Sequence, residues 1–96
     1  MKVRLEQRVV SFVRTLPPET RRKIDAALTA LEKGHGDILG LEAELAGFSR
    51  LRVGAYRIIY RHATSSTGPE IVCELAQRRN VVYEMFAAIL TEEGII

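Results

Sequence analysis

Cysteine and histidine are scarce in this sequence, and their scarcity removes several kinds of chemistry. A single cysteine, Cys73, excludes an internal disulfide, and its place in the apolar run IVCEL indicates a small buried side chain rather than a catalytic thiol. The two histidines, His35 and His62, lack the spacing and the companion ligands of a metal site. We therefore predict no metal ion and no cofactor.

Long apolar runs are also absent. No run approaches the roughly 20 residues that span a bilayer, and the start, MKVRLEQR, has charges where a secretory signal has its apolar region. We therefore expect no membrane contact and a cytoplasmic location. A length of 96 residues, with 47% hydrophobic and 27% charged residues and no internal repeat, predicts one globular domain over residues 1–96.

The N-terminal third has two apolar stripes at helical spacing after a short alternating strand, Lys2 to Gln7. The stripes consist of Val9, Phe12, Val13 and Leu16, and of Ile24, Leu28 and Leu31. Pro17 and Pro18 separate the stripes, and Gly34 is a natural stop for the second helix. This pattern predicts a helical hairpin.

The C-terminal half has the pattern of strands followed by a helix. Phe48 to Tyr60 predicts a tight β-hairpin, because Gly54 can take the positive φ that a two-residue turn requires. An extended piece around Ile38 to Leu41 precedes it, Glu70 to Arg78 alternates as a further strand, and a helix begins near Asn80, a good N-cap residue. The apolar stripe of this helix consists of Val82, Met85, Phe86 and Ile89. We predict an α+β fold: an N-terminal helical hairpin and a C-terminal helix packed on one face of a small, mostly antiparallel sheet.

Basic residues are concentrated along the chain although the net charge is only +2. Residues 1–33 and 50–83 each carry a net +4, whereas residues 34–49 and 84–96 each carry −3. Such segregation favours a polyanionic partner. The three consecutive basic residues at 21–23 lie on the outer side of a predicted helix, where a solvated face is the favoured interpretation.

The hairpin register gives the sheet two unlike faces, because directly opposed residues share a face. The predicted core face consists of Leu51, Val53, Tyr56, Ile58 and Tyr60, and the opposite face carries Arg50, Arg52, Arg57 and Arg61. Like charges opposed across strands destabilise a sheet. Two interpretations stay open: a bound anion offsets the repulsion, or the arginines form a solvated edge.

The end of the last predicted strand carries two arginines, Arg78 and Arg79. The first turn of the predicted last helix carries a tyrosine, Tyr83. If that strand pairs beside the strand of Arg57, Arg78 and Tyr83 converge on the arginine face. Arginines and a phenol, without paired carboxylates or a Ser/His/Asp set, suit phosphodiester chemistry on RNA. Arginine stabilises the phosphate, and the RNA's own 2′-hydroxyl can be the nucleophile.

Four segments carry a family resemblance: RLRVGAYRIIY, QRRNVVY, and the upstream LPPETRRKIDAALTAL and LEAELAG. Together they resemble the RelE/ParE superfamily of bacterial toxin–antitoxin toxins over nearly the whole chain. The resemblance implies a RelE-like fold of the microbial ribonuclease type. In the RelE branch it also implies an endoribonuclease that enters the ribosomal A site and cleaves mRNA there, leaving a cyclic phosphate and a free 5′-hydroxyl.

The resemblance also implies roles for individual residues. Arg57 matches the phosphate-stabilising arginine, and Tyr83 matches the proposed general base. Arg78 matches the arginine near the leaving group, with Arg79 as the alternative. The substrate-binding residues expected from the match are Arg50, Arg52, Arg61 and Arg79. The sequence departs from the usual family pattern at Ser49, Ala55 and Gln77.

Partners follow from the same resemblance, and more than one activity stays open. A cognate antitoxin is expected to form a hetero-oligomer with this chain through an acidic, amphipathic segment, and the ribosome and mRNA are the other expected partners. A ParE-like inhibitor of DNA gyrase without nuclease activity is one alternative, and a catalytically silent antitoxin-binding relative is another. The combination of Arg57, Arg78 and Tyr83 favours the nuclease.

Overall fold

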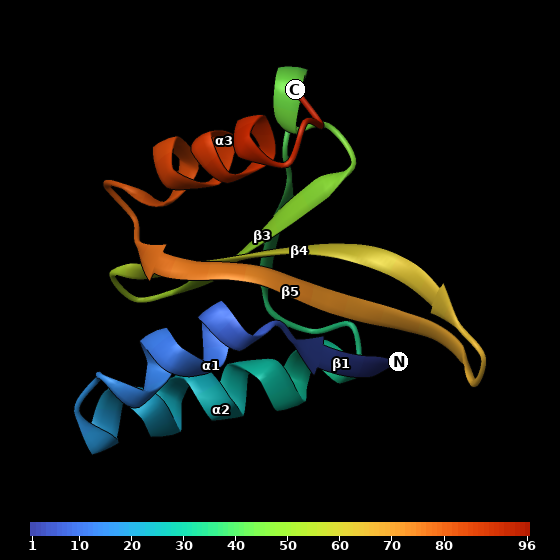
Figure 1. The fold of residues 1–96 in the computed structure, drawn as a ribbon. Coiled ribbons are helices and arrows are strands. Elements are labelled where there is room, and N and C mark those ends of the chain that lie inside the picture. The colour runs from blue at the N-terminus through green and yellow to red at the C-terminus, as the bar shows by residue number, and fades with distance from the viewer.

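Five strands, three α-helices and one short 3-10 helix make up the chain, and the computed structural model describes all of residues 1–96 (Figure 1). In chain order they are β1 (Lys2–Leu5), α1 (Gln7–Arg14), α2 (Pro18–Glu32), β2 (Asp37–Gly40), the 3-10 helix η1 (Ala43–Leu45), β3 (Phe48–Val53), β4 (Tyr56–Ser65), β5 (Gly68–Arg78) and α3 (Val82–Glu92). None of the helices is both long and apolar enough to cross a membrane.

Proline and glycine set the limits of the N-terminal helices as expected. Pro18 is the first residue of α2, where its missing N–H loses no hydrogen bond. After α2, Gly34 has a φ of 78°, which a residue with a side chain adopts only with strain. The predicted helical hairpin is thus confirmed. The predicted cap of the last helix is wrong, because Val81 precedes α3 and no side chain caps its first N–H groups.

The sheet has the strand order β1-β5-β4-β3-β2 and is mixed rather than mostly antiparallel. The strands from β2 to β5 pair antiparallel, but β1 runs parallel to β5 along its whole length. An ion pair of 3.4 Å between Arg4 and the buried Glu70 joins these two strands. The alternation of Lys2 to Gln7 predicted a strand here, but alternation contains no information about the direction of the neighbouring strand.

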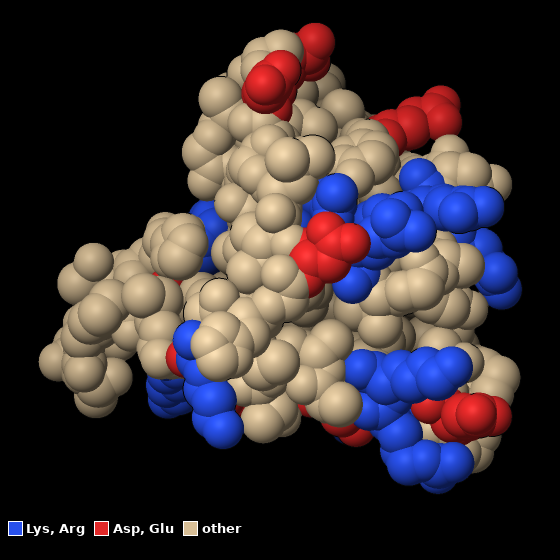
Figure 2. Space-filling model, turned by 180° about the vertical axis from the view of Figure 1, so that it is seen from behind, with Lys and Arg blue, Asp and Glu red and all other residues tan.

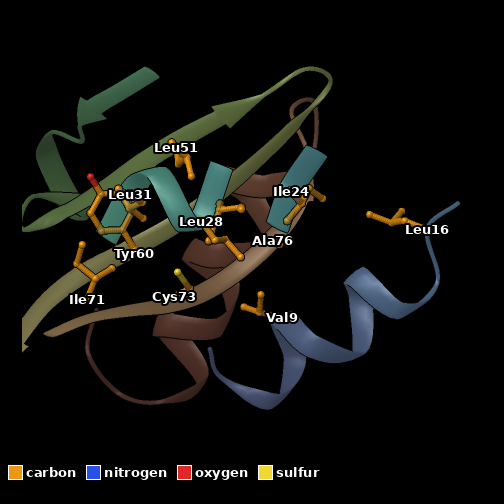
Figure 3. Packing of buried hydrophobic residues seen from close by; sticks show 11 residues of the cluster. Val9, Leu16, Ile24, Leu28, Leu31, Leu51, Tyr60, Ile71, Cys73 and Ala76 are labelled. Atoms are coloured by element: carbon orange, nitrogen blue, oxygen red, sulfur yellow. The ribbon is translucent and has the colours of Figure 1, made fainter. Parts of the chain in front are cut away.

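One face of the sheet is covered by α1 and α2. Figure 3 shows how side chains of these helices meet side chains of β3, β4 and β5 in this layer. The buried members of the cluster are Val9, Leu16, Ile24, Leu28, Leu31, Leu51, Ile58, Tyr60, Ile71, Cys73 and Ala76. Every residue of the predicted α2 stripe belongs to it, so the helical spacing identified the buried side of α2 correctly.

The other face is covered by α3, which corrects the prediction that all helices pack on one face (Figure 1). The second cluster consists of Ile59, Leu75, Val82, Phe86 and Leu90. Ile59 lies on the same face as Arg57 and Arg61, but it is fully buried under α3. The face that carries the arginines is therefore part core and part surface. Its exposed portion lies at the β3–β4 turn and along the strands beyond α3.

The register of the hairpin is the one predicted, with Val53 opposite Tyr56 and Arg52 opposite Arg57. Gly54 has a φ of 58°, as the two-residue turn requires. On the other side of β4, Ile59 lies opposite Leu75, but the next residue of β4 lies opposite Cys73. Glu74 is therefore an extra residue in β5, a β-bulge of the kind that redirects a side chain.

Candidate functional site

Carboxylates from other elements neutralise three of the four arginines on the hairpin. The Arg50 Nη1 donates hydrogen bonds to the Asp37 carbonyl oxygen at 3.0 Å and to its Oδ1 at 3.1 Å. The other oxygen of the same carboxylate lies 4.0 Å from the Arg52 Nη1. Asp37 stands on β2 directly opposite Arg52, so one edge strand supplies the counter-ion for both arginines of β3.

Arg61 belongs to a second charge cluster, together with Arg8, Glu74 and Glu93. The Arg61 Nε donates to the Glu74 Oε2 at 2.9 Å, and the Arg8 Nη2 donates to the Glu74 Oε1 at 2.8 Å. The bulge in β5 directs the Glu74 side chain between β4 and α1, and only 13% of that side chain is exposed. Arg8 also reaches Glu93 at the end of α3, at 3.4 Å. These ion pairs connect α1 and the end of α3 to the central strands β4 and β5.

Arg57 alone among the four has no acidic partner. Its Nη1 donates to the Gly54 carbonyl oxygen at 2.8 Å and to the Tyr56 carbonyl oxygen at 2.9 Å, which fixes the guanidinium against the turn. Its Nε and Nη2 make no hydrogen bond within the protein. These two atoms form the side of an arginine that binds a phosphate or carboxylate through two parallel hydrogen bonds.

Arg78 is the last residue of β5, and Arg79 lies in the turn that follows it. Arg78 is opposite Tyr56, on the face covered by α1 and α2, and its guanidinium carbon lies 5.5 Å from the centre of the Tyr56 ring. The Arg79 N–H donates to the Ala55 carbonyl oxygen at 2.8 Å, which continues the same register by one residue. The main chain of Arg79 therefore lies against the β3–β4 turn, next to the start of the strand that carries Arg57.

Tyr83 lies in the first turn of α3 and packs against the second core cluster. No hydrogen bond joins it to an arginine. It lines a groove between α3 and η1 together with Leu45, Ala87 and three carboxylates. Those carboxylates belong to Glu42, Glu44 and Glu84. The sequence predicted that Arg78 and Tyr83 converge with Arg57, and no contact in the structure joins the three.

Unpaired cations collect at one end of the molecule. Of the nine lysines and arginines without an ion pair, seven belong to the end of α1, the start of α2, the start of β4 and the end of β5 with its link to α3. These segments lie at one end of the molecule (Figure 1), and Figure 2 shows lysine and arginine side chains gathered on that side. The seven residues are Arg14, Arg21, Arg22, Lys23, Arg57, Arg78 and Arg79. We call this surface the basic end.

Contacts between distant segments assemble the basic end. The rings of Phe12 and Tyr56 lie 6.0 Å apart, which brings the end of α1 to the turn. Lys23 and Thr20 of α2 line a shallow hollow with the turn residues Val53 to Tyr56. The sequence analysis treated residues 21–23 as an isolated solvated helix face. No linear pattern revealed that Lys23 meets the hairpin, because about thirty residues separate Lys23 from the turn.

Asp37 and Glu74 are the functional neighbours that the sequence analysis missed. For Asp37 a signal existed, since an extended piece was expected nearby and its pairing with β3 places an acid opposite an arginine. For Glu74 the sequence contained no signal. Without the bulge, alternation along β5 would place its side chain on the face opposite to that of Arg61.

Cys73 is fully buried, as expected, and burial together with nearby Glu74 raises the pKa of its thiol to about 12. Nowhere do three or more His, Cys, Asp or Glu side chains gather as metal ligands do.

Neither a protein-family model nor a curated protein matches the sequence, but solved structures match the fold. A YoeB/ParE toxin from Agrobacterium tumefaciens matches with a TM-score of 0.66 and 17% identity, over 82% of this chain and 99% of that chain. The archaeal RelE–RelB complex from Pyrococcus horikoshii OT3 matches with a TM-score of 0.62 and 24% identity, over 81% and 93%. The toxin–antitoxin complex RelBE2 from Mycobacterium tuberculosis matches with a TM-score of 0.58 and 25% identity, over 81% and 96%.

Proposed function

From a fold that is that of the RelE/ParE superfamily, we propose that this chain is the toxin of a toxin–antitoxin pair. Three of the similar structures are complexes of a RelE-type toxin with its antitoxin. The basic end offers seven cations without internal partners, and an acidic segment of an antitoxin complements such a surface. The pair would be a hetero-oligomer in which the antitoxin covers the basic end.

We further propose that the free toxin is a ribosome-dependent mRNA endonuclease. The observation that carries this proposal is the free Nε–Nη2 side of Arg57, held in place by two main-chain carbonyl oxygens. An arginine that is positioned in advance and lacks a carboxylate partner is ready to bind the phosphate between two nucleotides. Because ribosomes and mRNA are cytoplasmic, the activity belongs in the cytoplasm.

In the proposed reaction the 2′-oxygen of one nucleotide attacks the phosphorus that links it to the next. The bond to the 5′-oxygen breaks and this oxygen takes up one proton, which balances the proton lost by the 2′-hydroxyl, so the products are a 2′,3′-cyclic phosphate and a free 5′-hydroxyl. Arg57 stabilises the negative charge that grows on the phosphoryl oxygens. Two observations support Arg79, rather than Arg78, as the second arginine: the main chain of Arg79 is hydrogen-bonded to the turn beside Arg57, and Arg78 lies over Tyr56 on the other face. Arg50 and Arg52 bind neighbouring phosphates of the strand.

Proton transfer from the 2′-hydroxyl is the role we assign to Tyr83. In the free chain this tyrosine lies beside carboxylates that repel RNA. We propose that mRNA held by the ribosome brings the hydroxyl to the groove of Tyr83, and that ribosomal groups complete the site.

The same groove favours a second candidate, a ParE-like inhibitor of DNA gyrase. Three glutamates beside Tyr83, and no contact between Tyr83 and the arginines, are what a toxin without a nuclease site would show. One of the similar structures is described as a YoeB/ParE toxin. The two candidates differ in the lesion they leave, which is cut mRNA for the nuclease and damaged DNA for the gyrase inhibitor.

Primer extension on a translated mRNA, after brief induction of the chain, separates these candidates. The nuclease proposal predicts cuts within codons that disappear with the variant Arg57→Ala. Arrested growth with intact mRNA and damaged DNA would replace the nuclease with the gyrase inhibitor. Normal growth without an antitoxin would indicate a catalytically silent relative.

A further inference from the structure

Asp37 is a carboxylate placed among the arginines of the proposed RNA-binding face. It lies at the start of the edge strand β2, whose residues are all exposed. Its two oxygens are shared between Arg50, at 3.1 Å, and Arg52, at 4.0 Å. More than half of the Asp37 side chain is exposed, whereas only 15% of the Arg50 side chain is. The acid therefore covers an arginine that would otherwise face solvent.

The contact has the properties of a replaceable one. The carboxylate partner is the exposed one, and a carboxylate in water gives up hydration and side-chain freedom when it forms an ion pair, which limits the net stability gained. The contact with Arg52 is long and includes no hydrogen bond. A phosphodiester carries the same single charge as the carboxylate, but a strand of RNA brings several phosphates at once and releases bound counter-ions. Binding of a strand can therefore displace Asp37 from both arginines.

We propose that Asp37 is an internal competitor that occupies the phosphate-binding position of Arg50 and Arg52 in the free protein. This inference rests on the proposed function, because it takes the ligand of the arginine face to be a single-stranded RNA backbone. When RNA binds, a phosphate takes the place of the Asp37 carboxylate, and the carboxylate turns to solvent. The acid lowers affinity for RNA in general and so limits binding outside the ribosome.

The test compares Asp37→Asn with wild type for binding of a fluorescent 12-nucleotide single-stranded RNA with 2′-O-methyl groups, which cannot be cleaved by 2′-oxygen attack. Asparagine keeps an oxygen for Arg50 but removes the charge. At low salt we expect Asp37→Asn to bind about fivefold more tightly. The gain should shrink as salt rises, because screening weakens the competing ion pairs as well.

A matched control excludes a general effect of net charge. Glu92→Gln changes the charge by the same amount at the exposed end of α3, where Glu92 makes no ion pair. Three outcomes would each overturn the proposal. They are an equal gain in RNA affinity for Asp37→Asn and Glu92→Gln, no gain in affinity for Asp37→Asn, and no RNA binding by Asp37→Asn or by wild type. In an Arg50→Ala, Arg52→Ala background the gain from Asp37→Asn should vanish, and a gain that persists there would also contradict the proposal.

A second measurement does not depend on a variant. In wild-type protein the NMR chemical shift of the Asp37 carboxyl carbon should move when the same RNA is added, because the carboxylate leaves Arg50. A shift that stays constant at saturating RNA would overturn the displacement. These results are independent of the cleavage assay. Tighter RNA binding by Asp37→Asn without any mRNA cuts in cells would retain this inference and reject the nuclease.

Discussion

Arg57 and Arg61 lie four residues apart on the same strand and the same face, but the structure gives them different roles. Arg61 binds Glu74, which the bulge in β5 directs toward it. Arg57 binds only main-chain carbonyl oxygens and keeps Nε and Nη2 free. The comparison shows that an arginine's role here depends on whether another element supplies a carboxylate. Residue type and alternation are identical for both.

The same distinction separates two regions of the molecule. Outside the basic end, Arg4, Arg8, Arg50 and Arg61 each have a carboxylate within 3.4 Å, and Arg52 has one at 4.0 Å. None of the seven residues of the basic end has one. Arg4, Arg8 and Arg61 join strands and helices to one another, Arg50 and Arg52 share one exposed carboxylate, and the cations of the basic end are available to a partner.

The comparison fails if the two arginines of β4 behave alike when each is removed. In a purified translation system, Arg57→Ala should lower the rate of mRNA cleavage at least about a hundredfold, because it removes charge stabilisation from the transition state. It should leave the midpoint of thermal unfolding nearly unchanged. Arg61→Ala should do the reverse, with cleavage within a few-fold of wild type and a loss of about 1 kcal/mol in the free energy of unfolding. Similar losses of rate in both variants would contradict the division.

Glu74→Gln tests whether the central cluster is structural. The change removes the charge that holds Arg8 and Arg61, and Glu74 is mostly buried. We expect the free energy of unfolding in urea to fall by about 2 kcal/mol, since hydrogen bonds between charged groups are the stronger ones. Glu92→Gln, at an exposed site, should change it by less than about 0.5 kcal/mol. Equal stability of the two variants would mean that the cluster contributes nothing.

Arg78 and Arg79, at and just after the end of β5, allow the finest comparison. The main chain of Arg79 is hydrogen-bonded to the turn beside Arg57, and Arg78 lies over Tyr56 on the face covered by α1 and α2. Arg79→Ala should lower the cleavage rate about tenfold, which corresponds to one charge-assisted contact to phosphate. Arg78→Ala should leave the rate within about twofold. A larger loss with Arg78→Ala would restore the assignment that the family resemblance implied.

Local patterns were sufficient for the features that depend on neighbouring residues. Gly54 and alternation predicted the turn and the register of the hairpin, and the spacing of Ile24, Leu28 and Leu31 predicted the buried side of α2. They were insufficient for α3. Its position on the arginine face depends on Ile59 and Leu75, two apolar residues that come together only when β4 and β5 pair.

The same distinction between local patterns and tertiary contacts applies to the candidate site. The sequence alone determined which face of the hairpin carries the arginines, because side chains alternate along a strand whatever surrounds it. Only the tertiary structure decided which arginines are neutralised. The edge strand β2 supplies Asp37, the bulge in β5 supplies Glu74, and helix packing brings Lys23 to the turn. Charge interactions depend on distance in space, which a linear pattern does not specify.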